Sequence, residues 1–136
     1  METKRFAVFV LAAALLSVSA PVFGHHGASQ YDMQHSKTLT ATVTGFVWSN
    51  PHCILSFDAQ DDKEAVKHWS VEMHNPLLLE RAGWTSTTLK PGDEIQVTFH
   101  PAKNGSGSGQ LYGLDAKISL HGTELPLEIG GDAGTN

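Results

Sequence analysis

The chain has 136 residues, and its nine Lys and Arg side chains face fourteen Asp and Glu, which gives a net charge of −5 at pH 7. This acidic balance argues against binding to nucleic acid or to an anionic membrane surface, because both attract positive charge. The only cysteine, Cys53, cannot form an internal disulfide, so packing must hold the domain together. We interpret its thiol as a small buried hydrophobic group.

The first 24 residues have the pattern of an export signal. Two basic residues precede the uncharged apolar run 6–18, which is about the length of a signal core and too short to span a bilayer stably. Val22 and Gly24 supply the small or moderately small residues needed before a cut, so we predict cleavage between Gly24 and His25. No second apolar run predicts a membrane anchor, and we expect a periplasmic or secreted protein.

The mature chain, residues 25–136, suits one compact domain. It keeps seven basic against thirteen acidic side chains, because the signal removes Glu2 and two basic residues. We expect an extended amino-terminal segment over 25–37, a β-domain over 38–128, and a flexible tail over 129–136.

A period of two in the apolar residues indicates strands. Over 38–49, apolar residues alternate with threonines, and we expect the apolar ones to form one buried face: Leu39, Ala41, Val43 and Val47. Gly45 is expected to form a bulge in this strand. A turn at Asn50 and Pro51 leads into a second strand, Cys53–Phe57.

After a polar hairpin loop, Val66–His74 is expected as the third strand. Its alternation places one set of residues on each face: Lys67, Trp69, Val71 and Met73 on one, and His68, Ser70, Glu72 and His74 on the other.

A short helix is predicted next, with Asn75 as its N-cap, Pro76 at its first position and Gly83 at its stop. A fourth strand follows at Glu94–His100, then a flexible polar loop with the sequence "NGSGSGQ" over 104–110, and a fifth strand over 111–120. Five strands with one helix between the third and the fourth favour an all-β, OB-like barrel, and a five- or six-stranded sandwich is the alternative.

Several characteristic motifs occur together in the chain: "HHGASQYD" behind the signal, "FVWSNPHC", "GW" followed by "LKPGD", and "GQLYGLDAKISLHG". With these motifs the chain resembles an uncharacterised family of small exported bacterial proteins, domain of unknown function 6152. The resemblance covers nearly all of the mature chain. It implies a small periplasmic β-rich domain without an established activity.

The adjacent histidines His25 and His26 raise the question of a metal site. If cleavage follows Gly24, His25 carries a free α-amine and an imidazole, which together can hold one Cu(II) ion. A second imidazole from His26 or His52 completes a three-nitrogen set, and we expect His52 at a strand start near a barrel mouth. The alternative is a solvated polar chain end.

Two other groups of residues carry weaker signals. His68, Glu72 and His74 share one expected strand face and suit zinc, but a solvent-facing polar row is the simpler interpretation. The aromatic residues predict either a ligand groove or ordinary packing: Tyr31, Trp48, Trp69, Trp84 and Tyr112.

Catalysis is not expected, because the sequence has no nucleophile elbow, no nucleotide-binding glycine pattern and no evident carboxylate pair. We therefore predict an exported binding module rather than an enzyme. Two classes stay open: a copper-binding module that uses the His25 terminus, and a module that binds another envelope protein or a small ligand without a metal.

Overall fold

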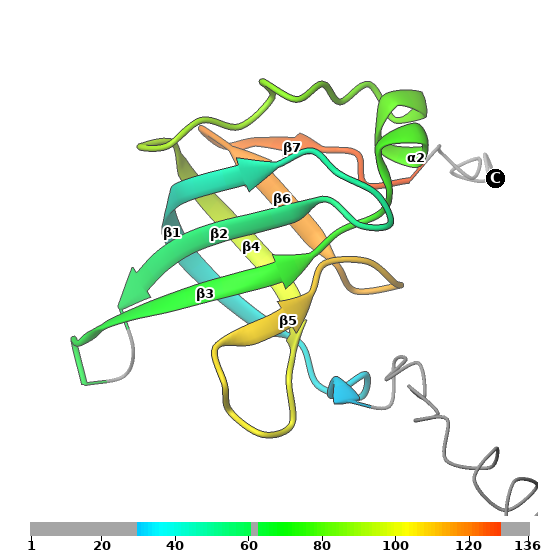
Figure 1. The fold of residues 1–136 in the computed structure, drawn as a ribbon. Helices are drawn as coiled ribbons and strands as arrows, with labels where there is room; N and C mark the ends of the chain where they lie inside the picture. Colours follow the sequence, from blue (N-terminus) through cyan, green and yellow to red (C-terminus); the bar gives the residue numbers. More distant parts are fainter. Residues whose placement is uncertain (1–29, 61–62, 129–136) are drawn as a thin grey trace, which may run out of the picture.

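The computed structural model describes residues 30–60 and 63–128, and it confirms a mostly β domain with one short helix (Figure 1). The elements are β1 (Lys37–Val47), β2 (Ile54–Gln60), β3 (Val66–Glu72), α2 (Pro76–Arg81), β4 (Glu94–Pro101), β5 (Ser108–Gln110), β6 (Lys117–Leu120) and β7 (Thr123–Leu125). His25, His26, the expected signal and the expected tail lie outside the described residues.

The strands close into the predicted OB-like barrel. The order β1-β2-β3-β5-β4 returns to β1 through a β1–β4 pairing, and only β3 and β5 run parallel to each other. β6 and β7 extend the sheet beyond β4, and α2 lies at one end of the barrel (Figure 1). Because one sheet closes on itself, the sandwich alternative is wrong.

β1 confirms the predicted bulge at Gly45, but the bulge overturns part of the predicted face. The pairing of β1 with β2 shifts between Val43 and Gly45, so one extra residue enters β1 there. The alternation of side chains therefore reverses, which leaves Phe46 half-buried and Val47 exposed. Val47 was expected beside Val43 in the core, and that prediction is wrong.

β5 corrects the expectation of a flexible loop over 104–110. Ser108–Gln110 closes the barrel by pairing with both β3 and β4. A Cβ atom added at Gly109 would lie 2.6 Å from Phe99 Cδ2 and 2.9 Å from the His100 carbonyl oxygen. Glycine is therefore required here by close packing rather than for flexibility.

The predicted fifth strand over 111–120 is wrong as a single strand. β5 and β6 occupy the same edge of β4, where His100 pairs with Gln110 but Thr98 pairs with Lys117. From His100 to Thr98 is two residues along β4, but their partners Gln110 and Lys117 are seven residues apart. Five residues more than a regular ladder needs therefore loop out between β5 and β6. Tyr112 lies in this loop, and β7, which the sequence did not predict, forms a hairpin with β6.

The core fills the barrel and is continuous with α2. Its fully buried members include Leu55, Phe57, Val71, Met73, Leu79, Val97, Phe99 and Leu111. Asn75 caps α2 as predicted, since its side-chain oxygen accepts from the Leu78 N–H. Gly83 has a φ of 94°, which matches the predicted left-handed stop.

Candidate functional site

His52 lies between the Asn50–Pro51 turn and the start of β2, as predicted, and is half-buried. Its Nδ1 is 3.1 Å from the Met73 carbonyl oxygen. Because a carbonyl only accepts hydrogen bonds, Nδ1 carries a proton, and in the neutral ring the lone pair is then on Nε2. Metal-binding histidines in proteins are commonly held in this way.

Backbone hydrogen bonds that extend the β2–β3 pairing bring His74 beside His52. The Cys53 N–H donates to the His74 carbonyl, and the Met73 N–H donates to the Cys53 carbonyl, so the pairing continues past the strand ends. The Nε2 atom of His74 lies 3.5 Å from Glu128 Oε1.

Tyr112 joins the two histidines. Its ring centroid lies 5.0 Å from that of His74 and 6.3 Å from that of His52, with interplanar angles of 30° and 7°. We call His52, His74 and Tyr112 the ring cluster. Its loops come together at the end of the barrel beside α2 (Figure 1).

A polar row lies next to the ring cluster on the outer face of the barrel. Glu72, Gln110 and His100 are register partners on β3, β5 and β4, and their chain neighbours point into the core. His100 and Gln110 are each only 2% exposed. The Gln110 Oε1 atom is buried and accepts no hydrogen bond from the described residues.

Tyr31 covers this polar row from the amino-terminal side and is 5% exposed. Burial raises the pKa of its hydroxyl above the ordinary value of 10.0, and the charge of Glu72 and the hydrogen bond to that carboxylate raise it further. Burial, followed by the charge of Glu72, also raises the pKa of Tyr112. Both phenols therefore stay neutral beside one carboxylate.

Backbone and side-chain bonds fix the first described residues on β4. Tyr31 forms an isolated bridge with Ala102, and the Asp32 N–H donates to the Pro101 carbonyl at 2.9 Å. The His100 Nδ1–H donates to the Asp32 carbonyl at 3.1 Å. The segment Tyr31–Asp32 is thus anchored beside the polar row.

The three residues considered as an alternative zinc set each have other partners. His68 contacts Asp58 through Nδ1, Glu72 bonds to Tyr31, and His74 stacks on Tyr112. Within residues 30–60 and 63–128, no three His, Cys, Asp or Glu side chains are grouped to hold a metal ion. Any metal bound by His52 would need ligands from outside these residues.

The aromatic residues mostly pack, as the simpler interpretation predicted. Trp69 and Trp84 are 6% and 2% exposed and belong to the core, so they line no open groove. Cys53 is fully buried, and burial raises the pKa of its thiol, which fits the expected hydrophobic role. Sequence reasoning missed the pairing of Tyr112 with His52, because it depends on the five-residue loop-out.

In the part of the chain that the structure describes, no helix is long and apolar enough to cross a membrane. The closed barrel and the ring cluster define a small OB-like β-barrel domain with an imidazole–phenol surface site. The chain belongs to the family of unknown function DUF6152, whose model matches residues 12–111 and so includes all five barrel strands and α2. No curated protein and no solved structure matches the chain.

Proposed function

We propose that this protein is an exported binding module that holds one Cu(II) ion between its mature amino terminus and the ring cluster. Residues 1–24 act as a cleaved signal, so His25 presents its α-amine and imidazole as two nitrogen ligands. His52 supplies the third ligand through Nε2. The protein binds its ion and catalyses no reaction.

One observation carries the proposal: the first described residues are anchored where the ring cluster lies. Tyr31 bonds to Glu72, whose charge also acts on Tyr112, and Tyr112 stacks on His52. Five chain steps separate His25 from Gln30, and they can span up to about 18 Å. The proposal requires this segment to place the His25 amine and imidazole against Nε2 of His52.

The donor set supports copper over harder cations. Imidazole and amine nitrogens suit Cu(II), whereas Mg²⁺ and Ca²⁺ prefer oxygen ligands. The hydrogen bond from His52 Nδ1 to Met73 orients the ring and, in the neutral tautomer, leaves the Nε2 lone pair available to the ion. Bound copper would supply a positive charge beside Glu72 and Glu128.

The test starts with copper analysis of untagged protein purified from the periplasm, with the amino terminus read by mass spectrometry. Calorimetric titration with Cu(II) then compares wild type with His52→Ala. We expect at least about tenfold weaker binding for this variant, as for loss of an oriented imidazole. His121→Ala is the matched control, because His121 is an exposed histidine on the β6–β7 turn. The Cu(II) affinity of this variant should match that of wild type.

A mature chain that begins elsewhere than His25 would remove the chelate and contradict the proposal. Equal affinities of wild type and His52→Ala would exclude His52 as a ligand.

A further inference from the structure

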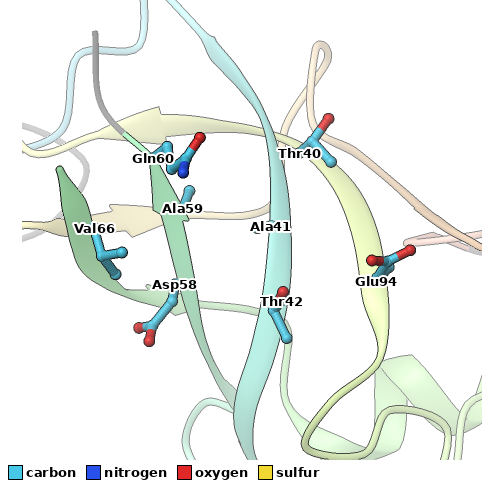
Figure 2. A pocket seen from close by; sticks show the side chains of 8 residues that line it. All are labelled: Thr40, Ala41, Thr42, Asp58, Ala59, Gln60, Val66 and Glu94. Atoms are coloured by element: carbon cyan, nitrogen blue, oxygen red, sulfur yellow. The ribbon is translucent and has the colours of Figure 1, made fainter. Parts of the chain in front are cut away.

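β1 and β2 pair along only part of their lengths within the closed barrel. Their pairing extends only to Thr42 and Asp58. Beyond that pair, Lys37–Ala41 pairs only with β4, and Ala59–Gln60 pairs only with β3. The two strand edges diverge (Figure 2), and we call the opening between them the wedge.

The edge of β1 presents to the wedge backbone groups that pair with no described strand. The Val43 N–H donates to the Asp93 carbonyl, and the Val43 carbonyl accepts from Gly92, so the backbone groups of Val43 face β4. Because these groups alternate in direction along a strand, those of Thr38 and Thr40 face the wedge. Such an edge is a template for a further strand.

Small side chains leave room for that strand. Ala41 and Ala59 stand at the two sides where β1 and β2 separate, and each is 5% exposed. The hollow over this point has a volume of about 460 Å³, and Thr40 and Gln60 also line it (Figure 2).

The charge on the lining of the hollow is negative. Asp58 and Glu94 line the hollow, and its lining includes no Lys or Arg (Figure 2). Asp58 also contacts His68 Nδ1. Lys37, which begins the β1 edge, has its Nζ 5.7 Å from the centroid of the Trp69 ring. The exposed side chain of Val66, at 60% exposure, adds an apolar contact on the β3 side.

We propose that the wedge binds an extended, basic peptide segment of a partner protein by strand addition to β1. The partner backbone bonds to the N–H and C=O groups of Thr38 and Thr40, which gives affinity without regard to its side chains. Its basic side chains lie on the outer face with Asp58, Glu94 and Val66, and its small apolar side chains point inward toward the two alanines. This interaction needs no metal and is independent of His52.

The test uses a defined probe, an acetylated octapeptide of alternating valine and lysine, added to the metal-free mature protein. Nuclear magnetic resonance follows amide shifts and hydrogen exchange. We expect shifts confined to 37–41 and 58–60, and at least tenfold slower exchange of the Thr38 and Thr40 amides. A peptide of alternating valine and glutamate should bind at least tenfold more weakly, because it meets like charge.

Thr40→Pro should weaken binding of the lysine peptide at least tenfold, because it removes an edge N–H that β4 does not use. Glu124→Pro is the matched control on β7, which is the last strand in the sheet order. There the Leu120–Thr123 pair closes the hairpin, so the N–H and C=O groups of Glu124 point away from β6. This control should bind like wild type. Thermal unfolding verifies that both variants fold.

Three results would overturn the proposal: no binding of the lysine peptide, equal binding by Thr40→Pro, or exchange protection on β7 instead of β1. Equal binding of the glutamate peptide would overturn the role of Asp58 and Glu94. None of these results bears on Cu(II) affinity, so the two proposals fail separately.

Discussion

The ring cluster and the wedge each lie where a strand pairing of the barrel ends, and the pairing ends differently at the two places. At the ring cluster, the backbone pairing continues past β2 and β3, and hydrogen bonds orient half-buried His52 and buried Tyr31. At the wedge, β1 and β2 separate and leave backbone groups that pair with no described strand. Oriented lone pairs suit a small ion, whereas an open edge suits an extended chain.

The largest expected effect is on the closure of the barrel at β5, which supports the end with the ring cluster. Gly109→Ala forces a Cβ against Phe99 and the His100 carbonyl, so we expect a loss of about 3 kcal/mol in the free energy of unfolding. Urea unfolding measures it.

Gly105→Ala is the matched control within the same glycine-rich stretch. Gly105 has a φ of 71° and open space around its Cα, so the cost should be only that of left-handed backbone, about 1 kcal/mol. Equal losses for the two variants would contradict the role of β5 as a packed barrel strand.

A smaller effect is expected from the phenols that cover the polar row. The pKa of Tyr31 is raised above 10.0 in the fold, so its contribution to stability is complete below pH 10 and is lost as pH rises through the folded-state pKa. Tyr31→Phe removes the hydrogen bond to Glu72 and should cost about 1 to 2 kcal/mol at pH 8.

The chain has only two tyrosines, so Tyr31→Phe combined with Tyr112→Phe removes the tyrosine contribution to the pH dependence. Between pH 9 and 11 this double variant should lose less unfolding free energy than wild type, as measured by urea unfolding across that range. An equal alkaline loss would mean that neither phenol is held neutral by burial and Glu72.

The comparison of the two regions also explains what the sequence could predict. Local signals were sufficient for α2, because Asn75, Pro76 and Gly83 act within a few residues of one another. Alternation identified the buried face of β3, where Trp69 and Val71 are in the core.

Features that depend on register were not predictable in the same way. The bulge at Gly45 was expected, yet its effect on Val47 requires counting the extra residue through the pairing with β2. Glycine and serine in 104–110 indicate flexibility, but Gly109 is needed for contact with Phe99, which is distant in sequence.

The residues of the candidate site were likewise predictable only in part. His52 could be chosen from its place after a turn and before a strand, but its neighbours His74 and Tyr112 follow from the backbone beyond β3 and from the five-residue loop-out. A tyrosine directly before a glycine, as in Tyr112 and Gly113, was the one available sign that the chain turns there. The wedge had no sequence signal, because it depends on where two strands separate.

The copper proposal is tested most directly by blocking the α-amine of the mature chain. Cu(II) titrations should compare authentic protein that begins at His25 with the same protein acetylated at the His25 α-amine. Acetylation turns this amine into an amide, whose nitrogen lone pair is delocalised, so affinity should fall several-fold or more while the unfolding free energy stays unchanged. Equal affinity with and without the acetyl group would contradict a copper site at the mature amino terminus.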